Sequence, residues 1–114
     1  MTLKTVLVVV VLLLIGYMLI TRRGDVSAAE ARRLITGGAK LVDVRSPGEF
    51  ASGHIDGAVN IPVQEIERRM SELGPKDTTV ILYCQSGARS ALAARRLKDA
   101  GYASVHNLGA MGRW

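Results

Sequence analysis

The 114-residue chain has very little cysteine, histidine and aromatic character: one cysteine, two histidines and five aromatic residues. A single thiol, Cys84, excludes an internal disulfide and any zinc site built from several thiolates. His54 and His106 lie far apart and show no metal-ligand spacing. We therefore expect no metal and no other cofactor, and any chemistry must come from ordinary side chains.

The formal charge of +5 does not indicate a nucleic-acid-binding protein. Residues 1–23 supply three of these charges, which leaves a net charge of only +2 for the rest of the chain. Three arginine pairs, at 32–33, 68–69 and 95–96, fall on expected helices and have no interleaved aromatic residues. Solvated helix faces explain such pairs better than a phosphate-binding stripe. We expect no nucleic-acid partner.

Long apolar runs are also scarce, with one exception at the start of the chain. Residues 5–21 carry no charge and correspond to about 25 Å of helix at 1.5 Å per residue. We expect residues 1–23 to be an uncleaved N-terminal transmembrane anchor that contacts the lipid bilayer through residues 5–21. A cleaved signal peptide is the alternative, but Thr-Arg-Arg follows the run where a small-residue cleavage site would stand.

Basic residues around this run predict its orientation. Only Lys4 precedes it, whereas four arginines follow: Arg22, Arg23, Arg32 and Arg33. Because positive charge collects on the cytoplasmic side of membrane spans, we expect a single-pass membrane protein whose remaining domain is cytoplasmic.

Strands and helices alternate along residues 24–114, which form the second expected domain. Apolar runs predict strands at 40–44, 58–61, 78–83 and 103–108. Helices are expected at 27–36, 63–73 and 90–100, with a further helical start at Pro47. This order predicts an α/β fold, with a small, mostly parallel sheet and helices on both faces.

Cys84 follows the most apolar of these strands, at the edge of the sheet where open α/β folds place their ligand sites. The loop that follows contains Gly87, which permits a tight turn, and Arg89, whose planar fork suits an oxyanion. It leads into a helix N-terminus, so backbone N–H groups and the helix dipole can hold an anion there. An isolated cysteine is commonly a packed small hydrophobe. In this setting we favour a thiolate nucleophile.

Two blocks of sequence, LVDVRSPGEFASGHIDGAVNIP (41–62) and YCQSGARSALAARRLKDAGYASVHNLGAM (83–111), resemble a single-domain rhodanese. The resemblance extends over residues 25–114. It implies a sulfurtransferase that takes sulfane sulfur from a small anionic donor such as thiosulfate and passes it to cyanide or a thiol. Cys84 matches the catalytic cysteine that forms the persulfide.

The active loop implied by the resemblance is six residues long, from Cys84 to Arg89. Rhodanese-like phosphatases of the cell-cycle type carry one residue more between cysteine and arginine, so this loop favours attack on sulfur over phosphatase or arsenate reductase activity. Arg89 is expected to orient the loop and bind the donor. The remaining residues expected to form the substrate site are Gln85, Ser86, Gly87 and Ala88.

Three other matched residues, Asp43, Arg45 and His54, are expected to be structural and near the site. Asp43 and Arg45 can pair with each other or brace neighbouring loops, and His54 lies in a turn that leads into a strand. One departure from the resemblance is Ala110, where relatives commonly carry a second glycine. If that position requires a positive φ, Ala110 would strain the turn.

Two functions of other classes are the alternatives. The domain could be a membrane-tethered binding module in which Cys84 is idle, or a redox sensor in which Cys84 is oxidised without transferring sulfur. The joint presence of Cys84 and Arg89 favours the sulfurtransferase, because a docking role gives no reason to keep both.

Overall fold

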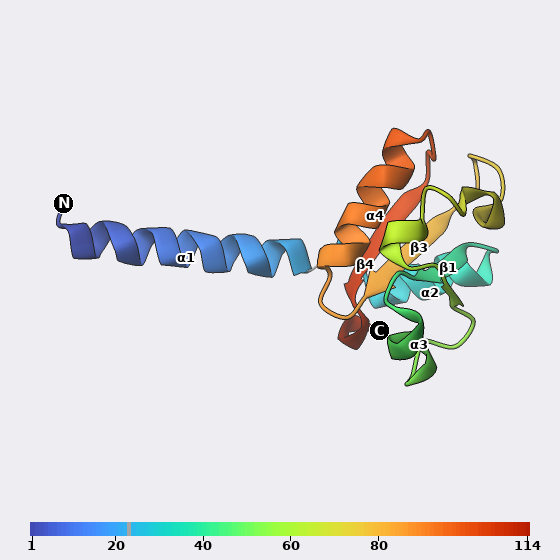
Figure 1. Cartoon of the computed structure of the whole chain (residues 1–114), viewed down its shortest axis with the longest axis horizontal. Helices are drawn as coiled ribbons and strands as arrows, with labels where there is room; N and C mark the ends of the chain where they lie inside the picture. Colours follow the sequence, from blue (N-terminus) through green and yellow to red (C-terminus); the bar gives the residue numbers. More distant parts are fainter. Residues whose placement is uncertain (23) are drawn as a thin grey trace.

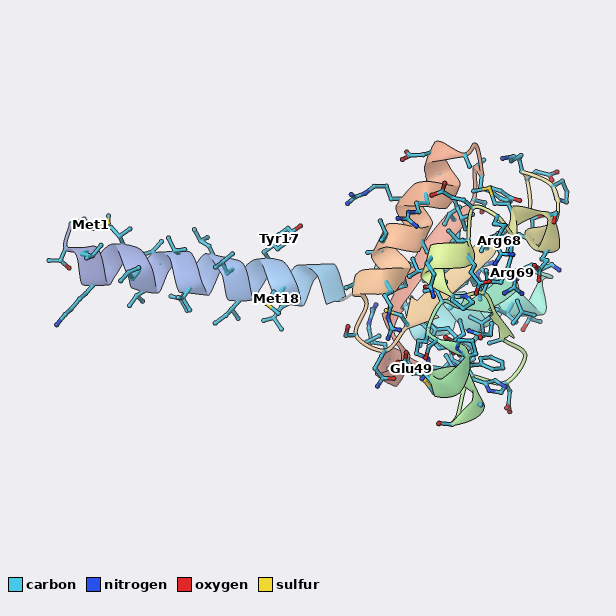
Figure 2. The ribbon with its side chains drawn as sticks, viewed as in Figure 1. Met1, Tyr17, Met18, Glu49, Arg68 and Arg69 are labelled. Atoms are coloured by element: carbon cyan, nitrogen blue, oxygen red, sulfur yellow. The ribbon has the colours of Figure 1, made fainter. Side chains whose placement is uncertain are left out.

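The computed structural model describes residues 1–22 and 24–114, with the side chains of residues 20–22 left outside the description. Helix α1 (Leu3–Arg22) projects from the compact remainder of the chain (Figure 1). Tyr17 and Met18 point to opposite sides of it (Figure 2). Most of its apolar side chains, from Leu3 to Leu19, are exposed.

The expectation of a transmembrane anchor is wrong. Among the described residues, no helix is both long and apolar enough to cross a membrane. The uncharged stretch at residues 5–21 gives about 25 Å of helix, short of a hydrocarbon core of about 30 Å. This finding contradicts the expected location as a single-pass membrane protein with a cytoplasmic domain. It also leaves the expected bilayer contact through residues 5–21 without support. Two of the four arginines that indicated the orientation, Arg22 and Arg23, lie outside the described side chains.

A four-stranded parallel sheet organises the rest of the chain. Its strands are β1 (Lys40–Asp43), β2 (Val59–Asn60), β3 (Val80–Cys84) and β4 (Val105–Ala110), in the order β2-β1-β3-β4. Every neighbouring pair is parallel. Strand β3 lies between β1 and β4, and all five of its residues are buried, as its uninterrupted apolar run predicts.

Both faces of the sheet are covered by helical segments (Figure 1). Because side chains alternate along a strand, Val80, Leu82 and Cys84 face one core and Ile81 and Tyr83 face the other. The first core contains residues of α4 (Ala88–Asp99) and of two short 3₁₀ helices, and the second contains residues of α2 (Ala28–Thr36). The predicted α/β fold, with its small parallel sheet and helices, is confirmed.

One predicted helix has a different form. Instead of a continuous helix over 63–73, the chain forms two 3₁₀ turns, η1 (Val63–Glu65) and η2 (Met70–Leu73). Ile66 and Leu73 are nevertheless fully buried. The apolar spacing therefore identified the residues that enter the core, but two short turns place them there as well as one helix would.

Ala110, the last residue of β4, is not strained, because its position does not require the positive φ that would have caused strain. Ala110 has φ −72° and ψ 136°, an extended conformation open to any residue. The positive φ of this region, +90°, falls on Gly109.

Candidate functional site

Cys84 ends β3 at the carboxyl edge of the sheet, and its side chain is fully buried. The Gly87 N–H donates to the Cys84 sulfur at 2.9 Å. Helix α4 begins at the next residue, so the sulfur also lies at the positive end of a twelve-residue helix. A negative charge on sulfur would be favoured by both features.

The turn that brings the Gly87 amide to the sulfur depends on glycine. Gly87 is the N-cap of α4 and has φ +105°, in a region that side-chain-bearing residues rarely adopt. The thiol of Cys84 in turn contacts Ser90 Oγ at 3.5 Å, and the Ser90 hydroxyl donates to the Gly87 carbonyl at 3.1 Å. Ser90 is fully buried, so the loop closes on a small polar network around the sulfur.

Arg89, in the first turn of α4, makes a two-pronged ion pair with Glu49. Its two terminal nitrogens donate to the two Glu49 carboxylate oxygens at 2.7 and 2.9 Å. Glu49 belongs to α3 (Pro47–Ala51) and is labelled in Figure 2. The Arg89 hydrogen bonds, together with one from the Ser46 backbone, lower the pKa of Glu49 to about 2. The pair connects the active loop to α3, a helix that lies forty residues earlier in the chain.

Asp43 and Arg45 form a buried ion pair at the end of β1. The side chains are 0% and 5% exposed, and an Arg45 terminal nitrogen lies 2.8 Å from an Asp43 carboxylate oxygen. Arg45 also donates to the Gly53 carbonyl at 2.6 Å and to Gln85 Oε1 at 3.2 Å. The guanidinium therefore connects the strand end, the loop after α3 and the active loop.

The other residues expected at the site take varied positions. Gln85, Ser86 and Ala88 are exposed on the loop around the buried sulfur. His54 is exposed as well: its ring stacks on Phe50 at 3.7 Å between centroids, and its Nδ1 lies 2.9 Å from the Phe50 carbonyl oxygen. These contacts give His54 a local structural role.

Two residues at the site, Glu49 and Ser90, were not expected from the sequence. Glu49 completes a capping box with Ser46, a spacing that is visible in the sequence, but its partner Arg89 is forty residues away. Ser90 lies six residues after Cys84, in the first turn of α4. Its hydroxyl contacts the sulfur because the tight loop between them brings this turn close to the end of β3. Capping patterns and helical period could have drawn attention to both residues, but neither pattern predicts the tertiary contact.

Comparison with known proteins places this chain in a family. A rhodanese-like domain model matches residues 27–114. A sulfurtransferase of Allochromatium vinosum is 50% identical over 68 residues, which cover 60% of this chain and 63% of that protein. Thiosulfate sulfurtransferase PspE of Escherichia coli is 38% identical over 71 residues, covering 61% of this chain and 68% of PspE.

The solved structures give the same result. The human single-domain sulfurtransferase TSTD1 superimposes with a TM-score of 0.67 at 32% sequence identity, covering 79% of this chain and 90% of that one. The matched segment of the family model ends at the last residue of the chain and includes Cys84, its loop and α4. The chain belongs to the rhodanese-like domain family, and its relatives in that family include sulfurtransferases.

Proposed function

We propose that this protein is a sulfurtransferase that moves sulfane sulfur from an anionic donor such as thiosulfate to cyanide or a thiol, through a persulfide on Cys84. The observation that carries the proposal is the position of the Cys84 sulfur, 2.9 Å from the Gly87 amide at the N-terminus of α4. A thiolate there is stabilised by the amide and the helix dipole. The relatives named as sulfurtransferases support the same chemistry.

In the first half-reaction the Cys84 thiolate attacks the outer, sulfane sulfur of thiosulfate. A sulfur–sulfur bond forms to Cys84, the bond between the two thiosulfate sulfurs breaks, and sulfite leaves with the bonding electron pair. The terminal persulfide sulfur then carries the negative charge, which the Gly87 amide and its neighbours on the loop can share.

In the second half-reaction the acceptor attacks the outer persulfide sulfur. With cyanide, a carbon–sulfur bond forms, thiocyanate departs, and Cys84 regains its electron pair as thiolate. With a thiolate acceptor the product is a new persulfide. Each half-reaction is a displacement at sulfur with no net redox change, so the chain's single cysteine suffices.

Access to the sulfur requires movement, because Cys84 is fully buried. The surrounding loop is the segment that can yield: Gln85, Ser86 and Ala88 are exposed, and the Arg89 side chain is 37% exposed. We infer that a donor reaches the sulfur by displacing part of this loop, while Arg45 and α4 hold the ends of the loop in place.

Intact-mass spectrometry of the full chain after incubation with thiosulfate tests the proposal. The wild type should gain one sulfur atom, Cys84→Ser should gain none, and cyanide should remove the added sulfur with release of thiocyanate. A folded wild type whose thiol reacts with an alkylating reagent but takes up no sulfur would reject the proposal. In that case, gain of oxygen under peroxide would favour a redox sensor, and an inert thiol would favour a binding module.

A further inference from the structure

The cationic fork of the active loop is already occupied by an anion of the protein itself. Both terminal nitrogens of Arg89 donate to Glu49, in the paired geometry that makes arginine–carboxylate contacts strong and directional. The two side chains are 37% and 35% exposed, so the pair lies at the surface, where a donor arrives. An incoming anion that uses this fork must compete with Glu49.

Glu49 is held in place independently of Arg89. Its Oε1 accepts hydrogen bonds from the Ser46 backbone N–H at 3.2 Å and from the Ser46 hydroxyl at 3.0 Å. The Glu49 N–H returns a bond to Ser46 Oγ at 3.2 Å, which completes the capping box of α3. While Glu49 is bonded to Arg89 and to Ser46 its pKa is about 2, well below neutral pH, so the carboxylate is charged when a donor arrives. The negative charge is therefore a fixed part of the site.

We propose that Glu49 is a positioning residue whose carboxylate competes with the donor anion for Arg89. This competition weakens the binding of dianionic donors more than that of monoanionic donors. The inference rests on the proposed sulfurtransferase function. A donor displaces Glu49 from the Arg89 fork as it binds. After the sulfur is transferred, the leaving anion is displaced when the Glu49–Arg89 pair forms again.

The charge of the donor gives this proposal a measurable signature. The interaction of a donor with the Glu49 charge is proportional to the donor's own charge. Removing the carboxylate should therefore help a dianion twice as much, on a logarithmic scale, as a monoanion bound in the same place. Thiosulfate and methanethiosulfonate form such a pair, because both give up a sulfane sulfur, releasing sulfite and methanesulfinate respectively.

The experiment compares Glu49→Gln with the wild type in the full chain, by the KM and kcat of persulfide formation with each donor at low ionic strength. Glutamine keeps the side-chain oxygen that accepts from Ser46 but loses the charge. We expect the KM for thiosulfate to fall about tenfold and that for methanethiosulfonate about threefold, with the difference shrinking at high salt. The kcat values should change much less.

Glu72→Gln is the matched control. Glu72 makes a similar two-pronged pair with Arg69, at 2.6 and 2.8 Å, on η2. Figure 2 labels Arg69 apart from Glu49. The control changes the net charge equally and should leave both KM values near those of the wild type. Glu49→Asp, which keeps the charge but moves it away from the fork, should shift both KM values in the same direction as Glu49→Gln, by less.

The outcomes separate this inference from the function on which it rests. Two results in Glu49→Gln would overturn the role of Glu49 and leave the sulfurtransferase intact: equal changes in KM for the two donors, or a rise in the KM for thiosulfate. Glu49→Asp provides the same test if Glu49→Gln does not fold. Failure of the wild type to take sulfur from either donor would overturn the proposed function and this inference with it.

Discussion

Ser90 Oγ lies 3.5 Å from the Cys84 sulfur, and the same hydroxyl donates to the Gly87 carbonyl at 3.1 Å. The contact joins the end of β3, the middle of the active loop and the first turn of α4 through one buried side chain. The surroundings of the sulfur therefore depend on a neutral hydroxyl and a backbone amide as well as on the nearby arginine.

Replacing Ser90 by alanine should weaken both the loop and the reaction. The Gly87 carbonyl would lose its hydroxyl donor, which costs about 1 kcal/mol of unfolding free energy. We expect persulfide formation from thiosulfate to slow by about threefold to tenfold, measured by rapid quenching and mass spectrometry. Ser71→Ala, at an exposed serine of η2, is the control and should match the wild type. A Ser90→Ala rate equal to that of the wild type would remove the hydroxyl from the mechanism.

Gly87→Ala tests whether the turn geometry is required. At φ +105° a methyl side chain costs about 1–3 kcal/mol, and relief of that strain would carry the amide away from the Cys84 sulfur. We expect lower stability in urea and at least a tenfold slower persulfide formation. Gly48→Ala on α3 is the matched control, because its φ is not positive and an added Cβ meets nothing within 4 Å. Equal rates in the two variants would contradict the argument.

Asp43→Asn should destabilise the fold more than any loss of a surface pair. Asp43 is fully buried and accepts four hydrogen bonds from Arg45, one of them from the backbone. Removing its charge leaves the Arg45 guanidinium buried without its counter-ion, a change that typically costs about 3 kcal/mol or more. Urea unfolding measures the effect. Glu65→Gln, which breaks a pair whose arginine is 71% exposed, should cost less than about 1 kcal/mol.

Much of the site could be read from the sequence because its parts are close together along the chain. The apolar run before Cys84 predicts a buried strand, and Gly87 and Arg89 follow it closely. Because the loop between β3 and α4 is short, the position of the strand end also determines where the helix begins. The parallel sheet follows from the alternation of elements for the same local reason. In such cases the nearest neighbours in sequence are also the nearest neighbours in space.

The features that escaped prediction depend on contacts between distant segments. The Glu49–Arg89 pair joins residues forty positions apart, and no pattern local to either residue indicates the other. The spacing of apolar residues over 63–73 was correct for burial but could not distinguish a continuous helix from two 3₁₀ turns, since both bury Ile66 and Leu73. The uncharged run at 5–21 indicated a helix, which forms as α1, but the inference that this helix crosses a membrane was wrong.

Tyr83 gives the fold a dependence on alkaline pH that can be isolated by one substitution. The residue is fully buried in the sheet core beneath α2, and its hydroxyl accepts a hydrogen bond from the Ile55 N–H at 3.1 Å. Burial raises the pKa of Tyr83 to about 12, against about 10 for an exposed tyrosine. The folded state therefore holds the phenolic proton over a range in which the unfolded chain releases it.

The sign of the effect follows from proton linkage. Between pH 10 and 12 the unfolded chain binds fewer protons than the native one, so the free energy of unfolding falls as the pH rises. Below pH 10 the contribution of Tyr83 is fully present. Tyr83→Phe should be less stable by about 1 kcal/mol at pH 7, because the Ile55 N–H loses its acceptor. The difference between the variant and the wild type should narrow above pH 10 and change sign before pH 12, because two pKa units correspond to about 2.7 kcal/mol, measured by urea unfolding at each pH. Parallel stability curves over that interval would show that the Tyr83 phenol titrates alike in the folded and unfolded chain.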